Sequence, residues 1–343
     1  MIMADGPFHP GRLRLARELR GWSQAKLARE VDVTPAAVSQ FESGASRPSR
    51  ETLEVLADQL AVPVEFLSLP LIETHEGFFR SLRRTAVVDR RRARAVAHVA
   101  HDLATHPDVV DMPPEPSFPE LPVDSVDTDR ATIEDRAAAV RRHWSLPPGP
   151  VPNMVKLIED HGIAVIRLPL GSADVDAFSL PFNDRPVIVL GTDKNDRARS
   201  RFDAAHELGH LVIHGQRIYG LPEVEQQAHW YAAAFLMPRE DIYDELPRRV
   251  DWPQLFGLKQ RWQTSLAALL MRARTLGTFT ELQYLTAIKT ASARGWRRVE
   301  PVPLGAPEHP RLLRDLMHAP AGQSARDALP HQLLSDLEKA TTH

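Results

Sequence analysis

Residues 206 to 210 read His-Glu-Leu-Gly-His, a pattern that can hold a metal ion on a helix. Residues four apart lie about one turn apart on one helical face, so His206 and His210 can both direct an imidazole nitrogen toward one ion. Glu207 is rotated by about 100° from His206, so its carboxylate can face a water molecule without being a ligand. In zinc hydrolases the metal activates such a water, and a glutamate accepts its proton and passes it to the leaving amine.

The flanking residues favour a helix buried beside a core over a surface helix whose histidines are four apart by chance. The apolar residues of this stretch are Phe202, Ala205, Leu208, Leu211 and Val212. His214 continues the four-residue spacing, and we expect it to be a histidine at the helix end rather than a ligand.

A catalytic zinc site needs a third protein ligand and an open position for water. The next predicted helix places Glu225, Ala228 and Ala232 on one face. Small alanines would let this helix pack closely against the motif helix and direct Glu225 at the metal. Glu223 and His229 are alternatives, and Glu225 could instead only begin the helix, where the helix dipole favours a carboxylate.

The composition excludes several classes of site. The 343 residues include no cysteine, which excludes disulfides, iron–sulfur clusters and thiolate zinc sites. No stretch reaches the ~18 apolar residues of a membrane span, and the first residues show no secretory signal, so we expect a cytoplasmic protein without a membrane partner. With a net charge of −3, contacts with nucleic acid have to come from a local patch.

The segment from residue 9 to 68 predicts a compact set of short helices. Ser23, Thr34 and Ser49 stand at N-cap positions, Pro35 at a first helical position, and Gly44 just after a helix. Short helices with a tight turn between them fit a helix-turn-helix unit.

Two stretches of unusual composition follow. Residues 80–94 hold one aspartate, Asp89, and seven arginines, which are Arg80, Arg83, Arg84, Arg90, Arg91, Arg92 and Arg94. This basic cluster could supplement a nucleic-acid surface, but a solvated helix face or a salt-bridge network explains it equally well. Residues 112–125 are acidic and rich in proline, which predicts an extended linker at the main domain boundary.

Residues 205–215 (AHELGHLVIHG) and 224–238 (VEQQAHWYAAAFLMP) together resemble the ImmA/IrrE family of metallopeptidases. The resemblance implies a zinc-dependent endopeptidase with His206 and His210 as ligands, Glu207 as general base and a glutamate as third ligand. Many relatives have Glu where this chain has Gln227, and a ligand at that position would bind zinc weakly or through an amide. We therefore expect Glu225 to be the third ligand. Manganese would also fit a His/His/Glu set.

Residues 13–62 resemble the XRE family, the phage-repressor type of helix-turn-helix protein, through Ser23-Gln24, Phe41-Glu42-Ser43-Gly44 and Arg47-Pro48. In this geometry the second helix of the motif lies in the major groove. The residues expected on or near its exposed face are Thr34, Pro35, Ala36, Ser39 and Gln40. Gln40 can pair with an adenine edge and Ala36 can meet a thymine methyl, while Gln24 and Arg47 would touch phosphates.

The alternative is a small domain used only for protein contact, which the charge of −1 over residues 1–70 favours.

Together these patterns predict a multidomain, mainly α-helical protein with a small α+β part. Strand candidates are residues 163–170, 176–182 and 185–191. The expected order is an all-α helix-turn-helix domain (8–70), a basic helical connector with a Pro-rich linker (71–127), a zincin-like metallopeptidase domain with a short sheet and the motif helix (128–240), a C-terminal helical subdomain (241–302) and a partly disordered tail (303–343).

Because stand-alone members of the protease family cut helix-turn-helix repressors, the fusion implies a bacterial transcriptional regulator whose protease domain cleaves itself, another regulator or an antitoxin. One alternative is a regulator whose protease-like domain senses a metal or ligand without cleavage. Another is an N-terminal domain that only recruits substrates. The expected partners are a double-stranded DNA operator, a protein substrate and a second copy of the chain, since repressors of this type act as dimers.

Overall fold

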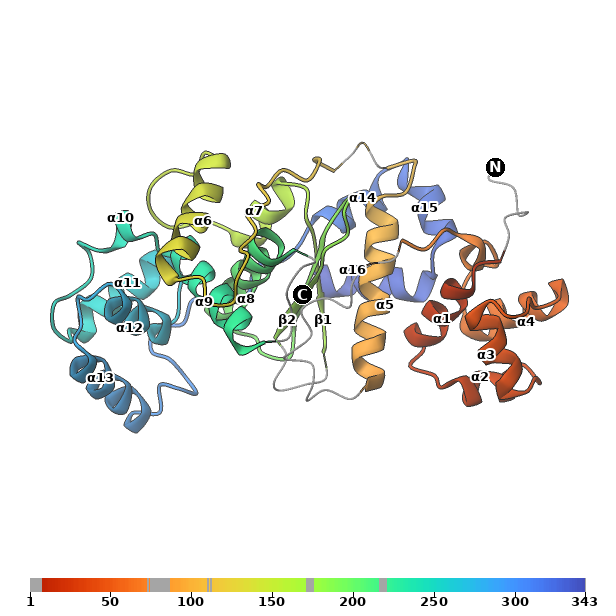
Figure 1. Cartoon of the computed structure of the whole chain (residues 1–343), viewed down its shortest axis with the longest axis horizontal. Coiled ribbons are helices and arrows are strands. Elements are labelled where there is room, and N and C mark those ends of the chain that lie inside the picture. Colours follow the sequence, from red (N-terminus) through yellow and green to blue (C-terminus); the bar gives the residue numbers. More distant parts are fainter. Residues whose placement is uncertain are drawn as a thin grey trace. The chain divides into compact units, whose positions relative to one another are not determined.

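The structure is a computed structural model that describes residues 8–72, 74, 87–109, 111, 113–170, 176–215 and 221–342 (Figure 1). The chain forms two compact units, each assembled from separate stretches of sequence. Unit 1 contains residues 1–116, 159–193 and 309–343, and unit 2 contains residues 117–158 and 194–308. Arg80, Arg83 and Arg84 of the predicted basic cluster lie outside the described residues.

Unit 1 begins with the predicted short helices, α1 (Pro10–Leu19), α2 (Gln24–Glu30), α3 (Pro35–Ser43), α4 (Arg50–Leu60) and the 3₁₀ turn η1 (Glu65–Ser68). The three predicted N-caps are confirmed, because the side chains of Ser23, Thr34 and Ser49 each accept a hydrogen bond from the backbone N–H three residues on. Gly44 ends α3 with φ +78°, a left-handed conformation that favours glycine. Helices α2 and α3 pack together as the helix-turn-helix pair.

A buried ion pair joins α1 to α3. Arg17 Nε and Nη2 donate to Glu42 Oε1 and Oε2 at 2.5 and 2.9 Å, and both residues are at most 5% exposed. Gln24 Nε2 donates to the same carboxylate at 2.9 Å. Burying such a pair costs desolvation energy. Removing either partner from the folded protein is strongly destabilising, because the other charge is then buried without compensation.

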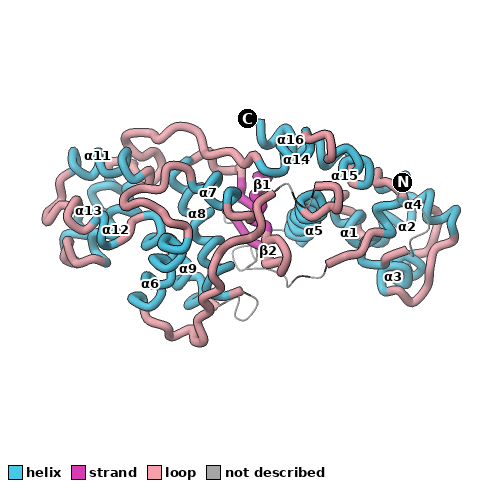
Figure 2. Tube along the Cα trace, turned by 90° about the horizontal axis from the view of Figure 1, so that it is seen from above, coloured by secondary structure: helices cyan, strands magenta, loops and turns pink. Residues whose placement is uncertain are grey.

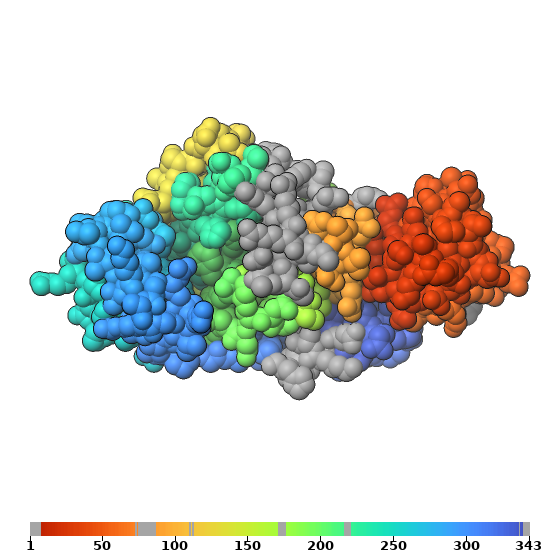
Figure 3. Space-filling model, turned by 90° about the horizontal axis from the view of Figure 1, so that it is seen from below, coloured from red at the N-terminus to blue at the C-terminus, as the bar shows by residue number. Residues whose placement is uncertain are grey.

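The rest of unit 1 is a small sheet with helices packed on it (Figure 2). The predicted strands are β1 (Ala164–Leu168), β2 (Ala177–Leu180) and β3 (Val187–Gly191), in the order β1-β3-β2. Strand β3 pairs parallel with β1 and antiparallel with β2. Helix α5 (Val87–Ala104) packs against α1 and against β1 and β3, so it lies between the helix-turn-helix and the sheet. In the space-filling view the surface of α5 adjoins that of the first helices (Figure 3).

The C-terminal tail differs from the expectation of partial disorder. It forms α14 (Leu312–His318), α15 (Gly322–Ala328) and α16 (His331–Thr342), and α14 and α16 contact β1. The carboxylate of Glu159 accepts hydrogen bonds from the backbone N–H groups of Arg311 and Leu312 at the start of α14. Burial raises the pKa of Glu159 to about 7 although these two amides lower it. The prolines and glycines of the tail therefore separate helices, and α14 and α16 are held by contacts with β1 and Glu159, which lie far earlier in the sequence.

Unit 2 is helical. It contains α6 (Arg130–His143), most of α7 (Met154–Asp160), α8 (Arg197–Gly209), the π-helical turn η3 (His210–His214), α9 (Pro222–Leu236), α10 (Arg239–Ile242), α11 (Trp252–Trp262), α12 (Leu266–Thr275) and α13 (Glu281–Ala293). Helix α9 packs against both α6 and α8. None of the described helices is both long and apolar enough to cross a membrane.

The Pro-rich segment before α6 has neither helix nor strand over 113–123, in line with the predicted extended chain. From residue 117 on it is nevertheless anchored within unit 2. Leu121 and Val123 donate their backbone N–H groups to the carbonyls of Val212 and Ile213 in η3, both at 2.9 Å. This segment therefore lies along the turn that carries the end of the histidine motif.

Glu42→Ala is expected to lower the free energy of unfolding by about 3–5 kcal/mol, because it leaves the Arg17 guanidinium buried without its carboxylate. Glu54→Ala is the matched control, since it breaks the exposed ion pair with Arg50, and should cost about 0.5 kcal/mol or less. Denaturant unfolding of both variants checks this. Similar losses in the two would show that the buried pair contributes no more than a surface pair.

Candidate metal centre and DNA-binding surface

Helix α8 is anchored over its first turns, before it presents the histidines. The side chain of Asp196 caps it by accepting from Arg199 N at 2.7 Å. Arg201, on the same helix, forms a buried ion pair with Glu308, whose other carboxylate oxygen accepts from Met154 N at 2.7 Å. These contacts fix the rotation of α8 about its axis, and with it the direction in which His206 and His210 point.

Helices α8 and α9 approach closely at Gly209. A Cβ placed on Gly209 would lie 2.8 Å from the Tyr231 ring, nearer than side chains tolerate. Ala228 and Ala232 on α9 are fully buried, which agrees with the expectation that small residues there let α9 pack on the motif helix. Glycine is therefore required at 209 by the space between the helices rather than by backbone conformation.

Three potential ligand side chains converge where α8 continues into η3 beside α9. His206 Nε2 lies 3.1 Å from His210 Nε2, and Glu225 places its carboxylate oxygens 3.4 Å from His206 Nε2 and 3.9 Å from His210 Nε2. In a tetrahedral zinc site with bonds of about 2.0–2.2 Å, ligand atoms stand about 3.3–3.6 Å apart. The three separations lie on both sides of this range, so the two imidazoles and the Glu225 carboxylate could hold a single ion with one position left for water.

Glu207 belongs to the same cluster. One carboxylate oxygen of Glu207 and one ring nitrogen each of His206 and His210 all lie within 4.8 Å of one another, and Glu207 is 3% exposed. A carboxylate at this distance from two potential ligand nitrogens can reach a water placed between them.

The other residues considered for third ligand are placed differently. Glu223 is exposed. His229 directs Nδ1 at the backbone carbonyl of Glu225 at 2.6 Å, and its ring meets the His206 ring edge-on at 4.6 Å. Gln227 is buried, but its amide forms hydrogen bonds with His214, Ser125 and Val126 and not with His206 or His210.

The hydrogen bonds of Gln227 determine the protonation of two histidines. Gln227 Nε2 donates to the carbonyls of Ser125 and Val126 at 3.1 and 3.0 Å, so its Oε1 has to face His214 Nε2, at 2.9 Å. His214 Nε2 therefore carries the proton, and His214 Nδ1 accepts from His210 Nδ1 at 2.9 Å. His210 is thereby protonated on Nδ1, which leaves the lone pair of Nε2 directed at the metal position.

Burial keeps these imidazoles neutral. Desolvation lowers the pKa of His210 well below its ordinary value, and it lowers the pKa of His214 to about 4 even though the Gln227 bond raises it. Neutral imidazole is the form that binds a metal. The neutral state of His210 and His214 is therefore compatible with a metal ion bound beside His206, His210 and Glu225.

The π-helical turn η3 and the role of Gln227 were missed by sequence reasoning. In η3 the Gly215 N–H bonds to the His210 carbonyl, five residues back. This turn brings His214 against His210 as a partner, so His214 is more than a histidine at the helix end. The sequence drew attention to Gln227 because it departs from the resembled pattern, but its partners Ser125 and Val126 lie about 100 residues earlier.

The residues predicted to face DNA are placed on the surface of the helix-turn-helix domain. All the predicted residues on α3 and at its N-cap are exposed, and so is Arg47. The residues on α3 and its N-cap are Thr34, Pro35, Ala36, Ser39 and Gln40. Gln24 is half-buried because its amide is held by Glu42. One exposed helix face thus carries the side chains that would read base edges.

Comparison with known families agrees with both resemblances. Residues 13–67 match the family model described as helix-turn-helix, and residues 158–274 match the one described as IrrE N-terminal-like domain. The chain joins a helix-turn-helix domain of the XRE type to an IrrE-like domain. The IrrE-like match contains the sheet, the histidine motif and α9, and it continues through α11 into α12, beyond residue 240. No curated protein matches the chain.

Gln227→Ala is expected to weaken zinc binding by about 10- to 100-fold, the usual effect of removing a residue that orients a ligand, because His214 would no longer hold His210 Nδ1–H. The bound amount at saturating zinc should stay the same. Competition with a chromogenic chelator measures the affinity. Gln226→Ala, an exposed neighbour on α9, is the matched control, and equal affinity in the two variants would contradict the orienting role.

Proposed function

We propose that this protein is a DNA-binding transcriptional regulator whose IrrE-like domain is a zinc-dependent endopeptidase. The observation that carries the proposal is the convergence of His206 Nε2, His210 Nε2 and the Glu225 carboxylate at 3.1 to 3.9 Å, beside the Glu207 carboxylate. Manganese would suit the same donors. The match of residues 158–274 to the IrrE N-terminal-like family supports the reaction class.

His206, His210 and Glu225 would hold the ion, which when bound lowers the pKa of a water and polarises the scissile carbonyl. Glu207 would accept the proton of the attacking water and deliver it to the amine that leaves. Glu225 would supply one negative charge to the donor set, and Glu207 would serve as the proton acceptor rather than as a ligand. The assignment of the two glutamates follows from position, since Glu225 reaches across from α9 to both histidines and Glu207 is a neighbour of His206 on α8.

The N-terminal domain would bring this activity to DNA. Thr34, Pro35, Ala36, Ser39 and Gln40 would contact bases from α3, and Arg47 and Gln24 would contact phosphates. The substrate would be the chain itself or another regulator or antitoxin, and the protein would act as a homodimer on paired half-sites.

Proteolysis is tested with purified zinc-loaded protein, incubated alone and with helix-turn-helix repressors encoded beside it, and analysed by mass spectrometry of the fragments. Glu207→Gln should lower the cleavage rate by about 10²–10⁴-fold and still bind zinc, because the ligands remain. Cleavage that is absent in both proteins, or equal in both, would favour a regulator whose IrrE-like domain only senses a metal or ligand.

DNA reading is tested on an operator selected from a random oligonucleotide library. Gln40→Ala should weaken binding to that operator by about 1–3 kcal/mol, the cost of losing a bidentate base contact, and leave binding to unrelated DNA unchanged. Gln226→Ala is the control for loss of an exposed glutamine. If the wild type selects no sequence, the domain serves protein contact instead.

A further inference from the structure

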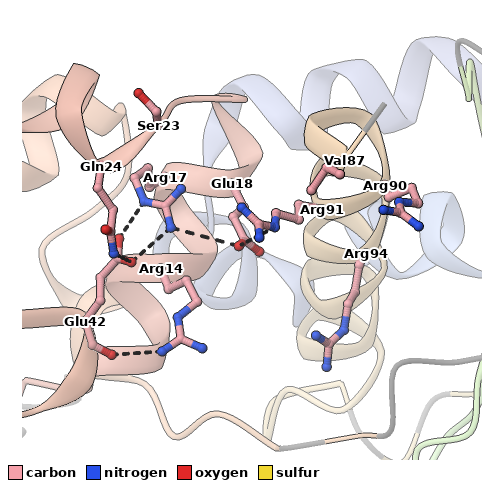
Figure 4. Close-up of a pocket in the computed structure, with 10 residues that line it drawn as sticks. All are labelled: Arg14, Arg17, Glu18, Ser23, Gln24, Glu42, Val87, Arg90, Arg91 and Arg94. Atoms are coloured by element: carbon pink, nitrogen blue, oxygen red, sulfur yellow. Dashed lines mark hydrogen bonds and ion pairs between the residues drawn. The ribbon is translucent and has the colours of Figure 1, made fainter. Parts of the chain in front are cut away.

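A cavity of about 640 Å³ lies in unit 1 between the helix-turn-helix and α5 (Figure 4). Its walls carry the basic side chains Arg14 and Arg17 of α1 and Arg90, Arg91 and Arg94 of α5. Cavities of this size hold small-molecule ligands. The function proposed above assigns no role to this cavity.

The cavity has an excess of positive charge. Its lining holds five arginines and two glutamates, Glu18 and Glu42, which leaves a formal charge of +3. Glu42 is paired with Arg17, and Glu18 lies 3.8 Å from Arg91 Nε and 3.9 Å from Arg17 Nη2. Both carboxylates are therefore engaged by two of the five guanidinium groups.

The other three arginines have no carboxylate partner among the described residues. Arg14 Nη2 donates to the Glu42 backbone carbonyl at 3.1 Å, and Arg94 Nη2 donates to that of Thr74 at 3.0 Å. Arg94 Nε is buried without a hydrogen-bond partner in the described part of the chain. In the close-up, Arg14 and Arg94 project from α1 and α5 toward the space between these helices (Figure 4).

Solvent is partly excluded from this space. Burial raises the pKa of Glu18 even though Arg17, Arg91, Arg14 and Arg94 all lower it. Charges interact more strongly where water is excluded, so an anion that entered the cavity would be held more firmly than on an open basic surface.

We propose that this cavity binds a small molecule carrying two or more phosphate groups. Guanidinium groups bind phosphate oxygens through paired, charge-assisted hydrogen bonds, and a charge near −3 would neutralise the excess on the lining. Arg14 on α1 and Arg91 and Arg94 on α5 point into the space between the two helices (Figure 4), which suits a ligand that enters it better than the backbone of a duplex lying across the surface.

The position of the cavity connects it to DNA binding. Ser23 and Gln24, at the start of α2, belong to its lining, and Gln24 is one of the residues expected to contact DNA phosphates. A ligand here would bridge α1 and α5 directly beside the surface that faces DNA. The proposed ligand binding does not depend on the metal centre, whereas its effect on DNA depends on the proposed DNA reading.

Isothermal titration of the full chain with sodium tripolyphosphate at physiological salt tests the proposal. We expect saturable binding of one molecule per chain, weakened at least about 10-fold in Arg90→Ala/Arg94→Ala, because charge-assisted contacts to two arginines are lost. Arg92→Ala is the matched control, since Arg92 is exposed on α5 but does not line the cavity. Repeating the titration in His206→Ala excludes heat from chelation of a metal at the histidines.

Lack of saturable binding to the wild type would overturn the proposal, as would equal weakening in Arg92→Ala. A duplex of random sequence provides the second arm. If Arg90→Ala/Arg94→Ala weakens duplex binding while the wild type does not bind tripolyphosphate, the arginines serve the DNA backbone and the cavity is not a ligand site.

Discussion

The close approach of α8 and α9 at Gly209 is the constraint on which the candidate metal centre depends. His206 lies on α8, His210 begins the continuous turn η3, and Glu225 lies on α9, so the separation of α8 and α9 sets the distances between the donor atoms. The Tyr231 ring, which a Cβ at position 209 would meet at 2.8 Å, is fully buried and cannot move aside. A larger residue at 209 would push the helices apart and separate Glu225 from the histidines.

The two domains use buried polar groups in different ways. In the helix-turn-helix, the buried Glu42 accepts hydrogen bonds from Arg17 and Gln24. Its charge is thus neutralised inside the domain, and the predicted DNA-contacting side chains of α3 are exposed. In the IrrE-like domain the buried groups are neutral histidines, whose orientation is set by a chain of hydrogen bonds from Gln227 through His214. The first arrangement stabilises a fold, whereas the second keeps a lone pair available for a ligand.

Local signals predicted much of this structure, and contacts between distant segments account for what they missed. The caps Ser23, Thr34 and Ser49 and the three strands were predicted because each depends on a few neighbouring residues. The helix α14 was not, because its N-terminus is capped by Glu159, about 150 residues earlier. The orienting role of Gln227 was also missed, because the backbone carbonyls that fix its amide belong to a segment that sequence reasoning treated as a linker.

The central claim is that His206, His210 and Glu225 hold one metal ion. Elemental analysis of purified protein tests it most directly, with wild type, His206→Ala, Glu225→Ala and the exposed control Glu223→Ala measured side by side. The predicted result is one zinc per chain in the wild type and in Glu223→Ala, and loss of zinc in the other two variants. A wild type without stoichiometric metal, or a Glu225→Ala protein that retains it, would contradict the claim.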